Sequence, residues 1–384
     1  MGTKKILMVT LEYYPIIWGG IATVVQLMIN GFQMSGTQVI LATIGDEKYS
    51  RVENGVFVIK IPRRRKSGES HPVYSTDRDD ETLKKLGTDF YMELFDLLPE
   101  IDSIICHNEE LFEFLRLVKE NYAHKRLAYF CHGLQSKEHP NDVHLHNDQE
   151  IAIGLSDYVL TASQSMQNQL NRLYPGKMTN HIILPLSLIP EIGKGTALNN
   201  GDINPAFYMA AGRMVPQKGF DLLIEAYGQN INRFSETQLK IYAGHGNQDY
   251  SDYCFKLLTK YSLPKTTICE WLPYSLLLEQ LSKALFLIVP SRFEPLGLIA
   301  AEALALGVPV IASQVDGLCE LLDYGNAGVL VECAEGPSIK QLGDAMSLLY
   351  SNENARRVLA VKGKQHLKTC YSLQRFIESV NSME

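Results

Sequence analysis

The sequence predicts an α/β fold of two domains, each built on a parallel sheet with helices on both faces. The 384 residues are enough for about two domains. Short apolar runs alternate with helix-like stretches in both halves of the chain, which is typical of parallel sheets whose two faces are covered. A segment rich in Pro, Gly and Asn between Pro185 and Asn204 interrupts this alternation, so we place the domain boundary there.

The N-terminal domain, residues 1–190, begins with Lys5–Thr10 (KILMVT), an apolar run that predicts a buried strand. A helix should follow the glycine pair at 19 and 20, because Val24, Leu27 and Met28 recur on one helical face. Further strands are predicted at residues 38–43, 103–106, 127–131 and 157–161.

The C-terminal domain, residues 205–370, shows the same alternation. Its strands are predicted at residues 207–211, 239–243, 267–270, 285–289, 308–312 and 328–331, with helices between them. We therefore expect two Rossmann-like domains with parallel sheets that face a central cleft.

Composition excludes some classes of function. The formal net charge is −7, whereas a general nucleic-acid binder carries a basic excess. The seven cysteines lack C-x-x-C spacing, as in a reduced cytosolic protein. No apolar run reaches about 18 residues and the start has no signal-peptide pattern, which favours a cytoplasmic location. The basic run Arg63–Lys66 fits a solvated loop, and it also fits contact with an anionic acceptor or a membrane surface.

The stretch SRFEPLGLIAAEALALGVPVIAS, residues 291–313, combines a loop, a helix and the next strand. In such units, ligands bind beyond the carboxyl end of the strand that precedes the loop. Backbone N–H groups around Gly297, Leu298 and Ile299, at the start of the helix, could hold a phosphate there.

Two glutamates of this stretch lie among apolar residues. Glu294 is in the loop, beside the same space, and Glu302 is just over one turn inside the helix with its side chain leaning back toward the helix start. Because an unpaired buried carboxylate is costly, Glu302 needs a partner. A sugar hydroxyl is one candidate. The alternatives are a buried base or a position on the surface.

A basic pair follows the first strand of the C-terminal domain. Arg213 and Lys218, in GRMVPQKG, have the spacing to contact two phosphates, Arg through its planar fork and Lys as a point charge. A solvated basic turn is the alternative.

Other strand ends carry weaker signals. The glycines of Trp18–Gly20 would let the backbone approach a ligand closely. His132, in Cys131-His132-Gly133, fits either a ligand contact or a structural role. His139, His144 and His146 lie in a polar stretch predicted as a loop at 134–147, but no Cys or carboxylate spacing supports a metal site, so none is expected.

Together these motifs resemble a known family. GRMVPQKGFDLLIEA followed by SRFEPLGLIAAEALALGVPVIAS is similar to the retaining glycosyltransferases of family 4, which have the GT-B architecture. LEYYPIIWGGIATVVQLM resembles their N-terminal glycine loop, and DYVLTASQSM resembles a segment near the end of their first domain. The resemblance covers nearly the whole chain. We also expect residues 371–384 to form a helix that returns to the N-terminal domain.

The resemblance implies a nucleoside-diphosphate sugar as donor, a UDP-sugar foremost, and no cofactor. Arg213 and Lys218 would bind the diphosphate, Glu302 the ribose hydroxyls, and Glu294 the transferred sugar or its phosphate. Of these, Arg213, Lys218 and Glu294 would act in catalysis.

The same resemblance assigns uncharged groups to the donor site. His132 would bond a sugar hydroxyl during catalysis. Backbone groups would contact the donor at Gly19, Gly20, Gly297, Leu298 and Ile299. Leu272, in the segment Glu270–Leu272, would help to position the base.

The implied activity is α-linked transfer of a hexose (glucose, N-acetylglucosamine or similar) to a hydroxyl of a small-molecule, glycan or lipid-linked acceptor. A metal ion should be dispensable, since Arg213, Lys218 and the helix N-terminus stabilise the charge that grows on the diphosphate. Same-face attack and double displacement both stay open. Alternatives are α-glucan elongation, a phosphorylase and a nucleotide-sugar epimerase. Ile17 counts against elongation, because glycogen and starch synthases carry lysine there, and no motif for a phosphorylase's pyridoxal lysine is visible.

Overall fold

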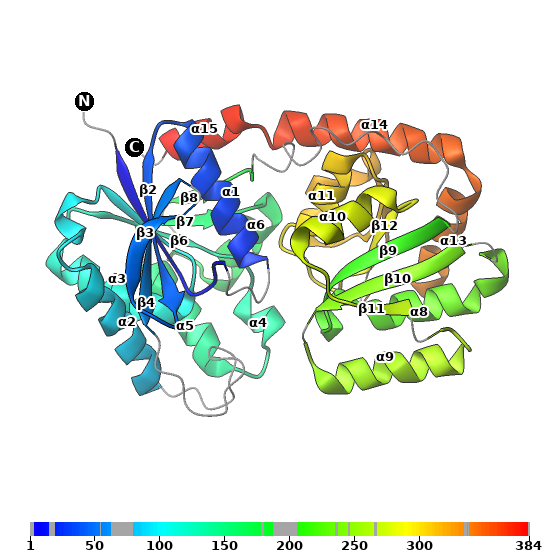
Figure 1. Ribbon diagram of the computed structural model, residues 1–384, viewed down its shortest axis with the longest axis horizontal. Coiled ribbons are helices and arrows are strands. Elements are labelled where there is room, and N and C mark those ends of the chain that lie inside the picture. Colours follow the sequence, from blue (N-terminus) through cyan, green and yellow to red (C-terminus); the bar gives the residue numbers. More distant parts are fainter. Residues whose placement is uncertain are drawn as a thin grey trace. The chain divides into compact units, whose positions relative to one another are not determined.

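The computed structural model forms two compact units. The N-terminal unit comprises Met1–Ala162, Met166–Leu184 and Phe376–Glu384, and the C-terminal unit comprises Ser163–Ser165 and Pro185–Arg375 (Figure 1). The structure describes residues 4–14, 20–53, 55–62, 80–177, 180–186, 206–234, 237–244, 246–264, 267–333, 336 and 338–382. Ile17, Gly19, the run Arg63–Lys66 and most of the predicted boundary segment lie outside these residues.

The described part of the N-terminal unit contains an 8-stranded sheet of order β3-β4-β2-β1-β5-β6-β7-β8. Pairing is parallel except between β3 and β4. The strand order reverses between β1 and β5, as in a Rossmann sheet. The strands are β1 (Lys5–Thr10), β2 (Gln38–Gly45), β3 (Tyr49–Glu53), β4 (Val56–Pro62), β5 (Ser103–Cys106), β6 (Arg126–Phe130), β7 (Tyr158–Thr161) and β8 (His181–Ile183).

Three of these strands were absent from the sequence prediction. β3 and β4 form a hairpin whose turn includes Gly55, at a φ of 80°, so this glycine after an asparagine was the missed signal. β8 is a short edge strand of only three residues, which carries too little periodicity to be recognised.

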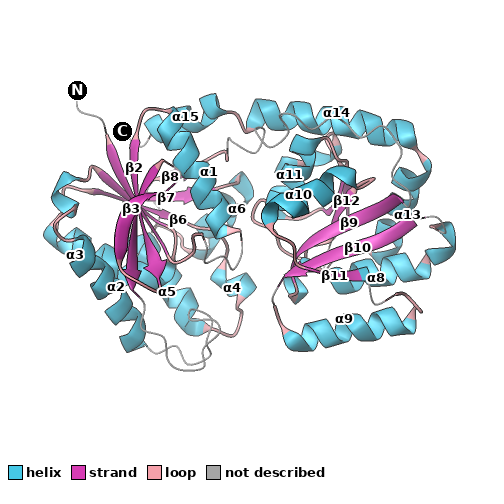
Figure 2. Ribbon diagram, viewed as in Figure 1, coloured by secondary structure: helices cyan, strands magenta, loops and turns pink. Residues whose placement is uncertain are grey.

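Helices cover both faces of this sheet: α2 (Asp80–Leu94), α3 (Phe112–Asn121) and α5 (Val143–Leu155) lie on one, and α1 (Ile21–Met34) and α15 (Leu373–Asn381) on the other (Figures 1 and 2). Directly after α6 (Gln164–Leu173), the hydroxyl of Tyr174 donates to Gln149 of α5 at 3.3 Å. The predicted face of α1 is buried at Val24, Leu27 and Met28. The ring of Phe376 on α15 packs edge-on against Phe32 of α1, with 5.2 Å between ring centroids.

The predicted loop at 134–147 is wrong. This stretch contains α4 (Gln135–Glu138) and the start of α5. Asp142 caps α5 by accepting a hydrogen bond from the Leu145 N–H at 3.1 Å, a capping signal that the polar composition concealed.

The described part of the C-terminal unit contains a 6-stranded parallel sheet of order β11-β10-β9-β12-β13-β14. Its strands are β9 (Ala206–Arg213), β10 (Thr237–Gly244), β11 (Ile268–Glu270), β12 (Leu287–Val289), β13 (Val310–Ser313) and β14 (Val329–Val331). All six were predicted, although β12 and β13 begin slightly later than expected. The order is again that of a Rossmann sheet, and it reverses between β9 and β12.

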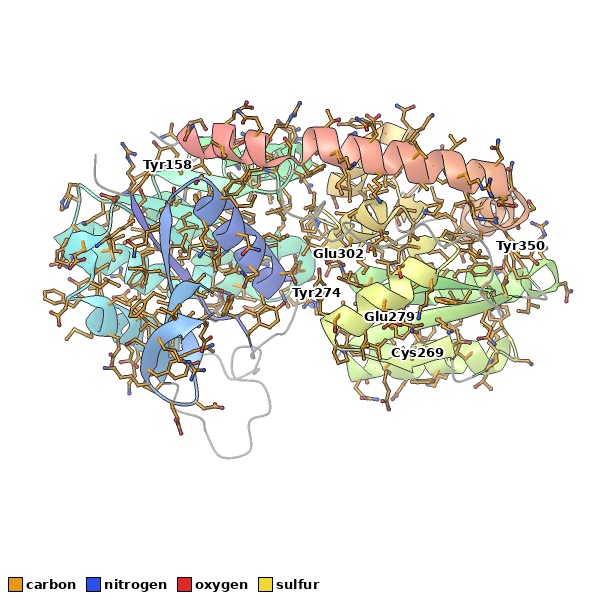
Figure 3. All side chains as sticks on the ribbon, turned by 45° about the horizontal axis from the view of Figure 1, so that its top comes forward. Tyr158, Cys269, Tyr274, Glu279, Glu302 and Tyr350 are labelled. Carbon is orange, nitrogen blue, oxygen red and sulfur yellow. The ribbon has the colours of Figure 1, made fainter. Side chains whose placement is uncertain are left out.

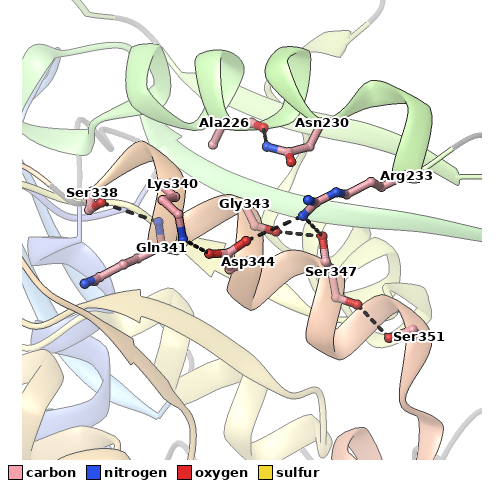
Figure 4. A network of polar contacts seen from close by, with 10 residues as sticks. All are labelled: Ala226, Asn230, Arg233, Ser338, Lys340, Gln341, Gly343, Asp344, Ser347 and Ser351. Carbon is pink, nitrogen blue, oxygen red and sulfur yellow. Dashed lines mark hydrogen bonds and ion pairs between the residues drawn. The ribbon is translucent and has the colours of Figure 1, made fainter.

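The helices of this unit form two layers on the sheet. α8 (Phe220–Gln229), α9 (Gln248–Lys260) and α13 (Ile339–Ser351) lie on one face, and α10 (Tyr274–Lys283), α11 (Leu298–Leu306) and α14 (Glu353–Cys370) on the other (Figure 2). The rings of Tyr208 and Phe286 stack in the core, with 4.7 Å between their centroids. Arg233 lies 3.5 Å from Asp344 and 3.4 Å from Ser347 of α13 (Figure 4), an exposed contact that contributes ~0–1 kcal/mol.

Candidate functional site

Two loops meet at the point where the C-terminal sheet reverses its strand order. One runs from β9 through Pro216–Lys218 to α8, and the other from β12 to α11. The Arg292 N–H donates to the Gln217 carbonyl at 2.7 Å. Gly219 has a φ of 66°, and a Cβ there would lie 2.0 Å from the Pro290 carbonyl oxygen. The first loop therefore needs glycine to lie this close to the second.

A partly buried ion pair connects the second loop to the start of α8. The guanidinium of Arg292 binds both carboxylate oxygens of Asp221, at 2.9 and 2.7 Å, and donates to the Pro216 carbonyl at 2.6 Å. Although burial raises the pKa of Asp221, hydrogen bonds from Arg292 and Tyr250 bring it below its usual value. Sequence reasoning missed this pair, whose members are far apart in the chain and belong to different motifs.

The predicted residues Lys218 and Glu294 are in direct contact across these loops. Lys218 Nζ lies 2.6 Å from Glu294 Oε2, and both side chains are largely buried. Ser291 donates to the same oxygen at 3.1 Å. The lysine stem lies along Gly212, where a Cβ would be 3.4 Å from it. Arg213 ends β9 at the same edge of the sheet. The site therefore presents cationic groups with a carboxylate between strand ends.

The N-terminus of α11 opens onto this edge. Gly297 precedes the helix with a φ of 92°, and a Cβ there would lie 2.5 Å from Leu318. The first hydrogen bond of the helix runs from the Ala301 N–H to the Gly297 carbonyl. The N–H groups of Leu298 and Ile299 belong to the first turn and are not used by the helix itself, so they can bind an anion.

Glu302 is buried inside α11, with 4% of its surface exposed. Its partner is neither a base nor solvent: the hydroxyl of Tyr274 donates to Oε1 at 2.8 Å (Figure 3). Burial raises the pKa of Glu302 to about 7, and the Tyr274 hydrogen bond opposes that rise. Tyr274 was not predicted, because a tyrosine at a helix start carries no motif.

The loop between β11 and α10 contains the predicted base-positioning residue. Leu272 is partly exposed there. The neighbouring Trp271 is 50% exposed, and its ring lies over Gly244, where a Cβ would be 3.4 Å away. A flat aromatic face is thus presented at the carboxyl ends of β10 and β11.

The described part of the N-terminal unit has a second polar cluster, at the carboxyl ends of β5 and β6. His132 Nε2 lies 2.9 Å from Nδ1 of His107. The centroid of the His132 ring lies 4.6 Å from the centroid of the Phe130 ring. Burial lowers the pKa of His132 to about 3, and burial together with His132 holds the pKa of His107 well below its usual value. Both imidazoles are therefore neutral at physiological pH.

A buried carboxylate lies in the same cluster. Tyr129 donates to Glu109 Oε2 at 2.7 Å, and Gln135 donates to the other oxygen. Burial and the neighbouring Glu110 raise the pKa of Glu109 to about 8. Gln149 donates to the Gly133 carbonyl at 2.9 Å and so fixes the turn after His132. His107 and Glu109 were not predicted as functional residues, because neither belongs to a recognisable sequence motif.

The remaining predicted positions are less distinctive. Gly20 precedes α1 with a φ of −79°, a conformation that does not require glycine. The ring Nε2 of His146 lies 2.9 Å from the His139 carbonyl oxygen. Among the described residues, no group of three or more His, Cys, Asp or Glu is placed to hold a metal ion. Within the same residues, no helix combines the length and hydrophobicity needed to span a membrane.

Two Rossmann sheets, with charged loops at the switch point of the second, define the chain as a two-domain GT-B-type α/β protein. Solved structures share this fold. One described as trehalose-6-phosphate from E. coli bound with UDP-2-fluoro glucose matches with a TM-score of 0.75 over 99% of this chain and 98% of that chain, at 14% identity.

Sequence comparison finds relatives among the glycosyltransferases. Residues 199–366 match the family described as "Glycosyl transferases group 1". An uncharacterized glycosyltransferase of Methanocaldococcus jannaschii is 26% identical over 356 residues, 85% of each chain. Glycogen synthase of Mycobacterium tuberculosis is 27% identical over 389 aligned residues, 96% of this chain and 92% of the relative. The C-terminal part of the chain, residues 199–366, is therefore similar to the group 1 glycosyltransferases.

Proposed function

We propose that the protein is a retaining glycosyltransferase that moves a hexose from a UDP-sugar to an acceptor hydroxyl and forms an α-linkage. The observation that carries this proposal is the Lys218–Glu294 pair beside the N-terminus of α11. An ammonium has three N–H donors, so Lys218 can keep Glu294 and still bind a diphosphate oxygen. The UDP-2-fluoro glucose of the E. coli structure supports a UDP-sugar as donor.

The reaction follows from where charge develops. The bond between the anomeric carbon and the diphosphate oxygen breaks, and its electron pair stays on the diphosphate. Arg213, Lys218 and the N–H groups at the start of α11 stabilise that charge. The acceptor oxygen bonds to the anomeric carbon from the same face, and its proton passes to the leaving phosphate oxygen. Same-face attack is favoured because Lys218 and Ser291 hold the Glu294 carboxylate, which makes it a poor nucleophile.

The other groups bind and orient the donor. Glu302 accepts hydrogen bonds from the ribose hydroxyls, and Leu272 lies beside the base. His132 binds a hydroxyl of the transferred sugar. Its Nε2 is shared with His107, so Nδ1 is the nitrogen that meets the ligand. The cations of the site take the place of a metal ion, and transfer needs none.

One experiment tests this function. The protein is incubated with UDP-, GDP- and ADP-linked glucose and N-acetylglucosamine, with and without a panel of hydroxyl acceptors. Release of nucleoside diphosphate is measured, and products are identified by mass spectrometry. NMR of the product gives the anomeric configuration. A β-linked product from an α-linked donor rules out retention, and release by wild type and Lys218→Ala at equal rates rules out the assigned site.

The similarity to glycogen synthase favours a second candidate, α-glucan elongation. Glycogen and maltooligosaccharides belong in the acceptor panel for this reason. Products that grow by several glucose units per chain support elongation, and a single transfer to a small acceptor supports the first proposal.

A further inference from the structure

The proposed function gives no role to Tyr274, although this residue contacts Glu302. Tyr274 is the first residue of α10, and α10 packs against α11. Its side chain is 36% exposed, whereas Glu302 is 4% exposed. The tyrosine therefore reaches from the protein surface to a buried carboxylate, and Figure 3 shows the two residues close together.

The hydroxyl of Tyr274 affects whether the Glu302 carboxyl group is ionised, and so how many hydrogen bonds it can accept. An ionised carboxylate accepts hydrogen bonds at both oxygens, whereas a protonated one donates at one of them. Two vicinal ribose hydroxyls need acceptors. Burial opposes the ionised form of Glu302, and the donor from Tyr274 favours it.

Charged groups on the neighbouring elements have partners of their own. On α10, Lys283 pairs with Glu279 at 2.6 Å. Before α11, Glu294 pairs with Lys218 at 2.6 Å. On α12 (Asp316–Leu321), Asp316 accepts from the Glu294 N–H at 3.1 Å. On α14, the ring of His366 lies 3.1 Å from the carbonyl oxygen of Glu320. The strands β12 and β13 next to α11 are apolar apart from Ser313.

We propose that Tyr274 is a positioning residue for the nucleotide ribose. Its hydroxyl bonds to Oε1 of Glu302 and fixes the carboxylate, so that Oε2 and the remaining lone pair of Oε1 accept from the two ribose hydroxyls. This inference rests on the proposed function of Glu302 as the ribose ligand.

The test compares two nucleotides. Binding is measured by calorimetry for whichever of UDP, GDP and ADP the wild type binds most tightly, and for the 2′,3′-dideoxy form of that nucleotide. Tyr274→Phe keeps the ring and removes the hydroxyl. It should bind the natural nucleotide about 10-fold more weakly and the dideoxy form as tightly as wild type does. Tyr253→Phe, an exposed tyrosine on α9, is the matched control and should change neither affinity.

The pH dependence of nucleotide affinity distinguishes this role from a purely structural one, which would leave that dependence unchanged. Without the phenol, Glu302 takes up a proton at a higher pH than in wild type. The affinity of Tyr274→Phe for the natural nucleotide should therefore begin to fall at a higher pH. In a Glu302→Ala background, Tyr274→Phe should have no further effect, because the side chain that accepts from the Tyr274 hydroxyl is already absent.

Three results overturn the inference. The first is equal weakening for both nucleotides, which marks a structural role. The second is unchanged binding of the natural nucleotide by Tyr274→Phe, and the third is an undiminished effect of Tyr274→Phe in the Glu302→Ala background. Failure of the proposed function gives a different result, because wild type itself then binds none of the three nucleotides. If wild type binds the dideoxy form as tightly as the natural nucleotide, Glu302 does not bind the ribose, and the role of Tyr274 is disproved with it.

Discussion

Both sheets reverse their strand order as in a Rossmann sheet, but the residues at their carboxyl edges differ in charge. In the C-terminal unit, Lys218 and Glu294 are charged partners 2.6 Å apart, next to a helix N-terminus. In the N-terminal unit, His107 and His132 are neutral, and Glu109 is buried with its pKa raised to about 8.

The difference suits two kinds of ligand. An edge with paired cations and unused N–H groups suits a diphosphate, whose charge must be met when the sugar leaves. An edge of neutral imidazoles and buried carboxyl suits hydroxyl groups, since they bind through hydrogen bonds and not through net charge. The fold provides the edge in both units, and the side chains decide the ligand.

The largest expected effect comes from breaking the charged edge. Lys218→Ala removes a cation from the diphosphate and leaves Glu294 buried without its partner, facing the same anion. We expect kcat/KM to fall about 100- to 1,000-fold. Steady-state kinetics with the active UDP-sugar measure the fall. Lys340→Ala, which removes an exposed ion pair with Asp344, should leave activity unchanged. A loss under about fivefold in a folded Lys218→Ala variant contradicts the assignment.

The next effect separates the two glutamates of the charged edge. Glu302→Ala should weaken nucleotide binding about 10- to 150-fold and leave kcat nearly unchanged, because a ribose contact is similar in the ground and transition states. Glu294→Ala should lower kcat instead, since it lies beside Lys218 where charge develops. Calorimetry with UDP and steady-state kinetics distinguish them. Normal nucleotide affinity in a folded Glu302→Ala variant would mean that Glu302 is structural.

A smaller effect tests the neutral edge. The folded pKa of Glu109 is about 8 and its unfolded pKa is about 4.3, so between these values only the folded state holds the proton. The free energy of unfolding should therefore fall as pH rises through this window.

Glu109→Gln is neutral at every pH and should lack this contribution. Relative to the variant, wild type should lose on the order of 1–2 kcal/mol between pH 6 and pH 8. Urea unfolding at several pH values measures the difference. Glu120→Gln, an exposed glutamate on α3, should follow wild type. Parallel curves for wild type and Glu109→Gln would show that Glu109 is ionised in the folded protein.

The smallest expected effect concerns metal ions. The proposed function assigns the positive charge to Arg213, Lys218 and the start of α11, so it predicts that excess chelator changes turnover by no more than about twofold. Activity that disappears with chelator and returns with Mg²⁺ or Mn²⁺ would show that the protein's cations are insufficient.

Much of the fold could be predicted because local patterns and the strand-order rule agree. The buried runs of the C-terminal sheet and the Gly307 end of α11 all appear where expected. β3 and β4 were missed because they form a partly exposed edge hairpin, whose pattern is weaker than that of a central strand. α4 and α5 were missed because polar residues and histidines hide a helix that its cap reveals.

Site residues that belong to a sequence motif could be predicted. Site residues that only the folded structure brings together could not. Lys218 and Glu294 lie in motifs, and the structure brings them into contact. Tyr274 meets Glu302 from another helix, and Arg292 meets Asp221 across two loops. Such pairs depend on three-dimensional packing, which no local pattern in a single sequence encodes.

The packing of α15 affects the order in which the chain can fold during synthesis. Phe376 is fully buried in the N-terminal unit, and a Cβ at Gly31 would lie only 2.7 Å from its ring. The segment Phe376–Glu384 follows the C-terminal unit in the chain. Domains generally fold from the N-terminus as the ribosome delivers them. In this protein the N-terminal unit cannot complete its core until Phe376–Glu384 has been synthesised, and that segment is translated after the C-terminal unit. The C-terminal unit can therefore complete its core first.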